Sequence, residues 1–169
     1  WSVAAIGHRL TGSDQGRLAE AAADSLFRLS GLPVVQRFPF EAQAWSRGQV
    51  KLTVGDGAGF LHLPAVALAN TPLDAQVEAP LIDAGNGLPA DLDRLGDRLE
   101  GRVALMNIGL VGAAEGTRNL HRSEKAALAL KKGAAAILFV NQGEGGVLLT
   151  GTASIDGRLI PVPAACIST

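Results

Sequence analysis

Apolar residues recur every three or four positions between residues 14 and 30, which is the spacing of one face of an α-helix. The pattern therefore predicts an amphipathic helix over this range. Ser13 is a suitable N-cap, and Gly31 followed by Pro33 ends the helix. An apolar stripe of this kind needs a partner surface to cover it. The stripe consists of Leu18, Ala21, Ala22, Ser25, Leu26 and Leu29.

Extended segments are predicted after this helix. Residues 33–40 are rich in β-branched and aromatic side chains, and residues 49–54 alternate between apolar and polar positions, so both ranges predict strands. A glycine-rich turn at residues 55–59 leads to a third predicted strand over residues 60–68, in which Pro64 indicates a strand edge or a break.

The pattern changes near residue 70, where a proline-containing connector predicts a domain boundary between residues 1–70 and residues 71–169. In the second part, a buried strand at 102–108, a helix at 118–132 and a buried strand at 134–140 follow one another. A strand, a helix and a strand within about 40 residues predict a right-handed βαβ unit with parallel strands.

Shorter elements flank this unit. Three short strands are predicted, at residues 77–84, 147–149 and 160–167. A short, solvated helical turn with a thin apolar edge is predicted at residues 91–102. The chain is therefore predicted to be a mixed α/β fold. In the helix predicted at residues 118–132, one face is expected to pack on the sheet and carries Leu120, Ser123, Ala127 and Leu130.

Composition and charge exclude several classes of protein. Hydrophobic residues make up 47% of the 169 residues and charged residues 18%, which is a globular balance. The formal net charge of −1 and the absence of a basic run argue against nucleic-acid binding. The longest apolar run, residues 134–140, is too short to cross a bilayer, so no membrane insertion is expected. The single cysteine, Cys166, rules out an internal disulfide.

The residues themselves offer no catalytic or metal site. His8, His62 and His121 are far apart, and the pair His121 and Glu124 is read as a solvated helix surface rather than a chelate. The loop at residues 109–116 follows a strand and precedes a helix, but its glycine spacing matches no nucleotide-binding motif and its Glu115 would repel phosphate. No nucleophile elbow is present.

A set of spaced features nevertheless resembles the protease-associated (PA) domain. A strand ends at Gly109, and a helix with Lys125 and Ala129 leads into Gly133. An apolar strand ending at Asn141 and an Ile-Pro segment at Ile160 complete the likeness. The resemblance covers residues 71–169 and implies a small β-barrel or sheet with a βαβ unit and flanking helices. One departure is the stretch Leu120, His121 and Arg122, where the family often carries an aromatic residue.

The first part resembles the start of M28-type zinc aminopeptidases. Its segment from Gly7 to Ser13, followed by an alanine-rich helix, Gly31 and the strand with Phe38 and Phe40, is similar to that family, in which a PA domain is commonly inserted. The resemblance implies two zinc ions in a catalytic domain beyond Thr169. It implies no metal ligand and no catalytic residue within this chain.

The expected function is therefore that of a non-catalytic fragment of a zinc-dependent aminopeptidase. The resemblance implies that the PA domain caps the active site, restricts substrate access or binds proteins. It further implies a secreted or periplasmic protein with a peptide substrate. The apolar stripe predicts packing of the helix at 14–30 on the parent catalytic domain, or a homodimer through that helix in the isolated chain.

Two loops are the expected contact surfaces, residues 109–119 and residues 141–146. Within them the candidate substrate- or partner-binding residues are Arg118, Asn119, Asn141 and Glu144. Arg118 leads this set because a guanidinium binds a carboxylate through two hydrogen bonds.

Three alternatives stay open at the level of sequence. The first alternative is a free-standing PA-type interaction module. The second is the PA region of another secreted protease, such as a subtilisin-like enzyme, and the third is an α/β domain that binds a small ligand or a nucleotide. The motif from Gly7 to Ser13 argues against the subtilisin-like parent.

Overall fold

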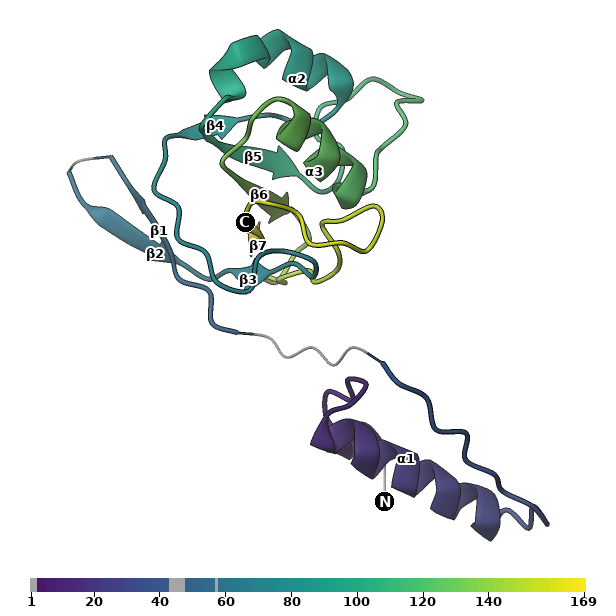
Figure 1. Ribbon diagram of the computed structural model, residues 1–169. Coiled ribbons are helices and arrows are strands. Elements are labelled where there is room, and N and C mark those ends of the chain that lie inside the picture. Colours follow the sequence, from purple (N-terminus) through teal and green to yellow (C-terminus); the bar gives the residue numbers. More distant parts are fainter. Residues whose placement is uncertain (1–2, 43–47, 57) are drawn as a thin grey trace. The chain divides into compact units, whose positions relative to one another are not determined.

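The computed structural model describes residues 3–42, 48–56 and 58–169. The chain divides into two compact units between residues 47 and 48 (Figure 1). This division lies well before the boundary predicted near residue 70. The segment between the two positions belongs to the second unit, because strand β3 (Val66–Ala67) pairs with strand β7 (Ala164–Ser168) from the other end of the chain.

The first unit is built around the predicted amphipathic helix. A short 3₁₀ helix, η1 (Val3–Ile6), precedes α1 (Asp14–Leu29). The hydroxyl of Ser13 accepts a hydrogen bond from the backbone N–H of Gly16 at 3.0 Å, as an N-cap should. At the other end Gly31 has φ of 79°, the left-handed conformation that closes helices. Both ends of the predicted helix are therefore confirmed.

Residues 33–40, predicted as a strand, form none. They run irregularly, and the Arg37 guanidinium makes an ion pair with Asp24 of α1 at 3.2 Å. A strand requires the backbone groups of a neighbouring strand, and no described segment pairs with this one. Side-chain composition alone was thus a misleading signal here.

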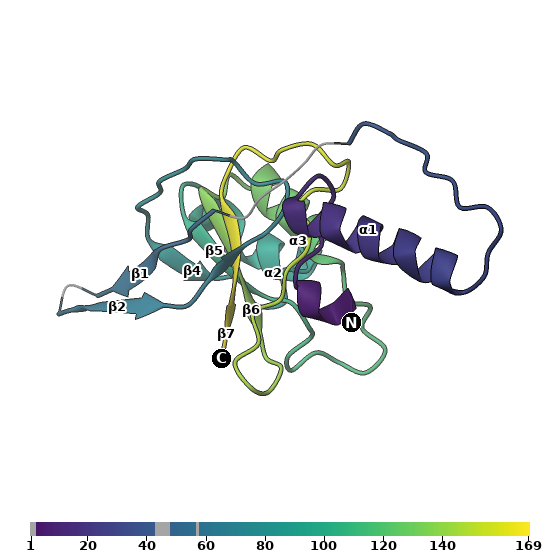
Figure 2. The same cartoon turned by 90° about the horizontal axis from the view of Figure 1, so that it is seen from below.

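The second unit opens with a hairpin of β1 (Leu52–Gly55) and β2 (Phe60–Leu63), which pair antiparallel. Both views show it projecting away from the larger sheet (Figures 1 and 2). Strand β2 ends at Leu63, and the next strand, β3, begins at Val66. The break predicted at Pro64 is therefore confirmed. The Phe60 ring lies against Gly55, where an added Cβ would come within 2.7 Å of it.

A five-stranded sheet forms the body of this unit. Its order is β3-β7-β6-β5-β4, with β4 (Leu81–Asp83), β5 (Val103–Asn107), β6 (Ala136–Asn141) and β7 mutually parallel and β3 antiparallel at the edge. The predicted βαβ unit is confirmed as β5, α3 (Arg122–Lys131) and β6.

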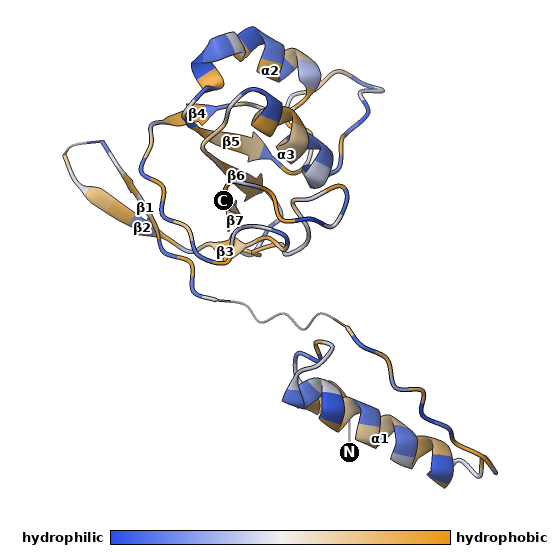
Figure 3. Ribbon diagram, viewed as in Figure 1, coloured by the Kyte–Doolittle hydropathy of each residue, from blue (hydrophilic) through white to orange (hydrophobic). Residues whose placement is uncertain are grey.

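One face of the sheet carries the core. Helix α2 (Pro89–Leu95), the 3₁₀ helix η2 (Gly96–Leu99) and α3 contribute buried side chains there, and the strands appear as the most apolar elements of the unit in Figure 3. The cluster is dominated by small side chains, which let the helices approach the sheet closely. Its members include Ala104, Met106, Ala126, Ala129, Ile137, Phe139, Ala164 and Cys166.

The opposite face of the sheet lies outside this core. Its alternate positions are also apolar but lie outside the core cluster. The central positions Ala136, Leu138 and Ala165 are buried, whereas the flanking positions Val103, Leu105, Val140 and Ile167 are only half-buried. Parallel sheets in proteins are normally covered on both faces. This face is therefore an apolar surface that the described chain leaves partly open.

Helix α3 begins later than predicted, at Arg122 rather than at residue 118. His121 is its N-cap: its backbone N–H donates to Glu124 at 2.8 Å, and its ring Nδ1 accepts from the Ser123 N–H at 3.3 Å. This reciprocal cap also explains the spacing of His121 and Glu124 without a metal. The buried face is shifted from the prediction and consists of Ser123, Lys125, Ala126 and Ala129.

Several predicted strands are shorter or absent. Residues 147–149 form no strand, and the strand predicted at 160–167 starts only at Ala164. Pro161 and Pro163 carry no backbone N–H and cannot donate to a neighbouring strand. Likewise the strand predicted at 77–84 is confined to β4.

We expect Phe139→Ala to lower the free energy of unfolding of the second unit by about 3–5 kcal/mol, because the ring is fully buried and its loss leaves a cavity. Phe60→Ala is the matched control: that ring is 81% exposed, so a change of no more than about 0.5 kcal/mol is expected. Urea unfolding followed by circular dichroism measures both. Equal losses in the two variants would contradict the described core.

Candidate partner-binding edge of the parallel sheet

The carboxyl ends of β4, β5, β6 and β7 lie at one edge of the sheet because the four strands are parallel. The loop that follows β5 and the loop that follows β6 both leave from this edge. In open parallel sheets, ligands bind at the carboxyl ends of the strands, where side chains from several strands meet. This edge is therefore where candidate functional groups are expected.

The four predicted contact residues lie in these loops but do not meet. Arg118 and Glu144 are exposed, and neither makes a hydrogen bond or an ion pair with any residue that the structure describes. Their charges are therefore free for a partner. Asn119 and Asn141 are already engaged. No hydrogen bond joins any two of these four residues, all of which lie in the described part of the chain.

Asn119 and Asn141 shape the loops that carry them. The Asn119 side-chain amide donates to the Ile108 carbonyl at 3.0 Å. The Asn141 amide donates to the Val147 carbonyl at 2.8 Å, while its own oxygen accepts from the Gly143 N–H at 3.2 Å. Both side chains thus bind loop backbone, which is a structural role, while part of their hydrogen-bonding capacity stays open.

Three further amide side chains lie at this edge and were not predicted from the sequence. Asn86 follows β4, Asn107 ends β5 and Gln142 follows β6. The Asn107 amide donates to the Asn86 oxygen at 3.2 Å, and the Gln142 amide donates to the Asn107 oxygen. The available signal was that each amide stands at the end of a predicted strand, and the carboxyl ends of parallel strands meet.

A buried lysine connects the core helix to this edge. Lys125 of α3 is 0% exposed, and its ammonium donates to the carbonyls of Asn107 and Ile108 at 2.8 and 3.0 Å. Burial lowers the pKa of Lys125 below its ordinary value, and the charge of Asp91 partly opposes this shift. The two carbonyls at which β5 passes into its loop are thereby held by one side chain.

Arg122, the first residue of α3, lies against the backbone of Gly151. Its Nε is buried without a hydrogen-bond partner, and a Cβ at position 151 would overlap its guanidinium. Glycine at 151 therefore permits the close approach of this loop to the helix. Nearby, burial raises the pKa of the Cys166 thiol, so Cys166 stays a neutral thiol at pH 7 and is a core residue, as its sequence context suggested.

Metal chemistry finds no support at this edge. Across residues 3–42, 48–56 and 58–169, no three His, Cys, Asp or Glu side chains come together in a way that would hold a metal ion. The residues present do not fit a zinc centre. None of the helices in the described part of the chain combines the length and the apolar character that spanning a bilayer needs.

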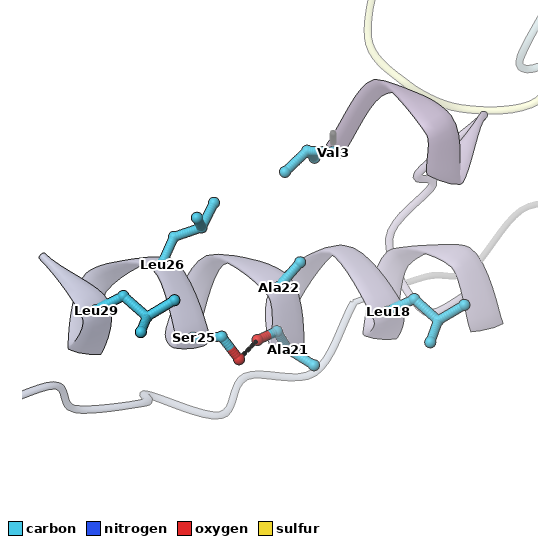
Figure 4. Close-up of a pocket in the computed structure, with 7 residues that line it drawn as sticks. All are labelled: Val3, Leu18, Ala21, Ala22, Ser25, Leu26 and Leu29. Carbon is cyan, nitrogen blue, oxygen red and sulfur yellow. Dashed lines mark hydrogen bonds between the residues drawn. The ribbon is translucent and has the colours of Figure 1, made fainter. Parts of the chain in front are cut away.

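A second candidate surface lies in the first unit. Along α1 the predicted stripe forms a shallow apolar groove together with Val3 of η1 (Figure 4). Leu18, Leu26 and Leu29 are 55%, 49% and 84% exposed, so the described residues of the first unit cover the stripe only in part. The groove is lined by Val3, Leu18, Ala21, Ala22, Ser25, Leu26 and Leu29.

A family model described as the PA domain matches residues 75–169, more than half of the chain. The match confirms the resemblance inferred from Lys125, Ala129, Gly133 and Asn141, and with it the mixed α/β fold class. A search of curated proteins finds no match.

Solved structures with a similar fold include three bacterial proteins. A zinc aminopeptidase from Bacillus subtilis is 23% identical with a TM-score of 0.67, and an aminopeptidase from Aneurinibacillus sp. strain AM-1 is 25% identical with a TM-score of 0.61. In both, the likeness covers 99% of this chain and 36% of the other. A peptidase M28 precursor from Shewanella amazonensis is 22% identical, with a TM-score of 0.68 over 98% of this chain and 40% of its own. The chain therefore spans well under half the length of these proteins.

The lowered pKa of Lys125 predicts a pH dependence of stability. Between that pKa and about 10.5 the unfolded chain binds more protons than the folded chain, so the free energy of unfolding rises with pH across this window. This gain in the free energy of unfolding is complete above the pKa that Lys125 has in the unfolded chain. It is lost as the pH falls through the pKa that Lys125 has in the folded chain. Urea unfolding from pH 7 to 10.5 measures it.

Lys125→Met removes this titration, so we expect that variant to lack the rise. Lys131→Met is the control, because Lys131 is on the same helix and exposed. A rise of the same size in all three proteins would show that other groups cause it.

Proposed function

The chain belongs to the PA-domain family, and on that premise we propose that it is the non-catalytic amino-terminal and PA region of an M28-type zinc aminopeptidase. Its PA domain caps the active site of the parent enzyme, restricts the access of substrates and offers a surface for protein contacts. The two zinc ions belong to the catalytic domain, and the parent protein is secreted or periplasmic. Peptides are its substrates.

The observation that carries this proposal is the extent of the structural likeness. It includes α1 and the extended segment that follows as well as the PA domain, and it occurs with proteins more than twice as long as this chain. A free-standing PA module has no need of the first unit. The likeness therefore supports a parent peptidase over the alternative of an isolated interaction module or of another secreted protease.

The uncovered apolar surfaces agree with a missing catalytic domain. Fully burying a side chain such as Leu26 contributes about 1.5–3 kcal/mol, and because 49% of Leu26 is exposed, the described chain gains only part of this. In the parent enzyme this groove packs on the catalytic domain. Without that domain, a homodimer through the helix at residues 14–30 covers the same groove, and light scattering on the isolated chain distinguishes the dimer from a monomer.

The parent protein is tested first by the intact mass of the native polypeptide in its source. Peptides continuing past Thr169 and zinc-dependent aminopeptidase activity are the expected result. A native polypeptide of 169 residues without activity would overturn the peptidase proposal and favour a binding module.

Docking of α1 is tested in the parent enzyme with Leu26→Glu, which places a charge in the groove. We expect a melting temperature several degrees lower than that of the unchanged enzyme, because the charge is buried without a partner. In the isolated chain, at a concentration at which light scattering shows a monomer, Leu26 is exposed and the same substitution should leave stability nearly unchanged. Ala23→Glu, outside the stripe at a half-buried position of the first unit, is the control and should lower stability by the same amount in both proteins. A loss for Leu26→Glu that is no larger in the parent than in the isolated chain would contradict the docking model.

Arg118 is proposed as the residue that contacts a carboxylate of the substrate or partner, with Glu144 as a second charged contact. Asn119 and Asn141 support them by holding the backbone of their loops. Arg118→Ala should raise KM in the parent enzyme about two- to fivefold for substrates that carry a free carboxylate, with kcat unchanged, because an exposed ion pair contributes about 0.2–1 kcal/mol.

Arg118→Lys keeps the positive charge but lacks the paired donors of a guanidinium. Its KM should therefore lie between those of the unchanged enzyme and Arg118→Ala. Arg98→Ala, in η2 at the opposite edge of the sheet, is the matched control and should leave KM unchanged. If Arg98→Ala raises KM as much as Arg118→Ala does, the role assigned to Arg118 is wrong.

A further inference from the structure

Three amide side chains form a continuous chain of hydrogen bonds along the carboxyl edge of the sheet. Gln142 donates to Asn107, and Asn107 donates to Asn86. Asn86 in turn donates to the carbonyl of Val111 at 3.0 Å and accepts from the N–H of Val111 at 2.8 Å. The chain thus starts in the loop after β6 and ends in the loop after β5, crossing the end of β5 on the way.

The paired bonds between Asn86 and Val111 determine the direction of the whole chain. The Asn86 amide matches the backbone of Val111 as a neighbouring strand would, donor to acceptor and acceptor to donor. Reversing this amide would place oxygen against oxygen and N–H against N–H. Since the Asn86 oxygen must therefore accept, Asn107 must present its NH₂ to Asn86 and its oxygen to Gln142. Gln142 is left with one role in the chain, which is to donate.

The surroundings of the amides make the arrangement specific. Asn86 and Asn107 are half-buried, whereas Gln142 is exposed. The backbone around Asn86 is itself held, because its N–H donates to Asp91 at 3.1 Å and the N–H of Asn107 donates to Gly85 at 2.8 Å. The side chain of Val111 is 52% exposed, so burial of its own side chain does little to keep it in place. Asn86 is the contact that fixes the position of Val111.

We propose that Asn86, Asn107 and Gln142 couple the loop at residues 109–119 to the loop at residues 141–146, so that the two loops act as one binding surface. Gln142 is the exposed end at which a partner acts, and Asn86 is a positioning residue that holds Val111. Chains of hydrogen bonds polarise one another, so a change at Gln142 alters the bonds at Val111. The inference rests on the proposed function for the use of these loops as a contact surface, whereas the coupling is a property of the free chain.

The test is the hydrogen-exchange rate of the Val111 backbone amide, measured by NMR in the free chain. In Gln142→Glu the new side chain has nearly the same shape, but its ionised carboxylate cannot donate to Asn107. We expect Val111 to exchange about tenfold faster than in the unchanged chain at pH 7, which is the effect of weakening one hydrogen bond. Asn86→Ala, which removes the bonds to Val111 directly, should give at least the same increase.

The pH profile separates coupling from a general loosening of the loops. Below about pH 4.3 the glutamate is protonated and again carries a donor. The ratio of Val111 exchange rates between Gln142→Glu and the unchanged chain should therefore return towards one at pH 3.5. Gln142→Ala, which has no donor at any pH, should keep an elevated ratio throughout. Gln76→Glu, at an exposed position, is the charge control and should leave Val111 unchanged.

Two results would overturn the proposal. One is a Val111 rate in Gln142→Glu equal to that in Gln76→Glu at pH 7, and the other is an elevated ratio that does not change with pH. Both measurements use the chain without a partner, so they do not depend on whether the parent protein is a peptidase. That question is settled by the intact mass and the activity, and either inference can fail while the other stands.

Discussion

The buried side chain of Lys125 organises the second unit. Its amino group joins α3 to the last carbonyls of β5, at the point where the chain leaves the sheet. A nitrogen with no exposed surface must place its N–H donors on buried acceptors, so the geometry of helix and strand is tightly defined. The close approach extends to Gly87, with φ of 64°, where a Cβ would lie 2.6 Å from Met106 and 3.3 Å from Lys125. Packing, charge and loop departure thus meet at one site.

From that site the two candidate loops acquire their positions by hydrogen bonds rather than by burial. Asn119 and Asn141 bind the backbone of their own loops, and the amide chain through Asn107 connects one loop to the other. The charged residues Arg118 and Glu144 stay unpaired within the described chain. A surface that is ordered by neutral amides and carries free charges is suited to contacts with a polar polypeptide, because the scaffold does not compete for the charged groups.

The apolar surfaces of the two units point to a partner of a different kind. The groove along α1 and the partly open face of the parallel sheet carry apolar side chains that the described chain covers only in part. Structures with the same fold belong to proteins of which this chain spans well under half. The proposal of a parent enzyme places these faces in its interior and assigns contacts with substrates and partners to the loops at the carboxyl edge.

The sequence by itself determined the features that depend on near neighbours. The helix at residues 14–30 with Ser13 as its cap and the βαβ unit follow from periodicity and local backbone chemistry. The spacing of Lys125, Ala129 and Gly133 carries the resemblance to the PA-domain family, which the family model confirms. Tertiary structure alone decided the rest. The strand expected at residues 33–40 does not form because no described strand pairs with it, and β3 pairs with β7 from the far end of the chain. Lys125 is buried, and three amides form one chain, because groups remote in sequence supply their hydrogen-bond partners. No local pattern encodes which remote groups those will be.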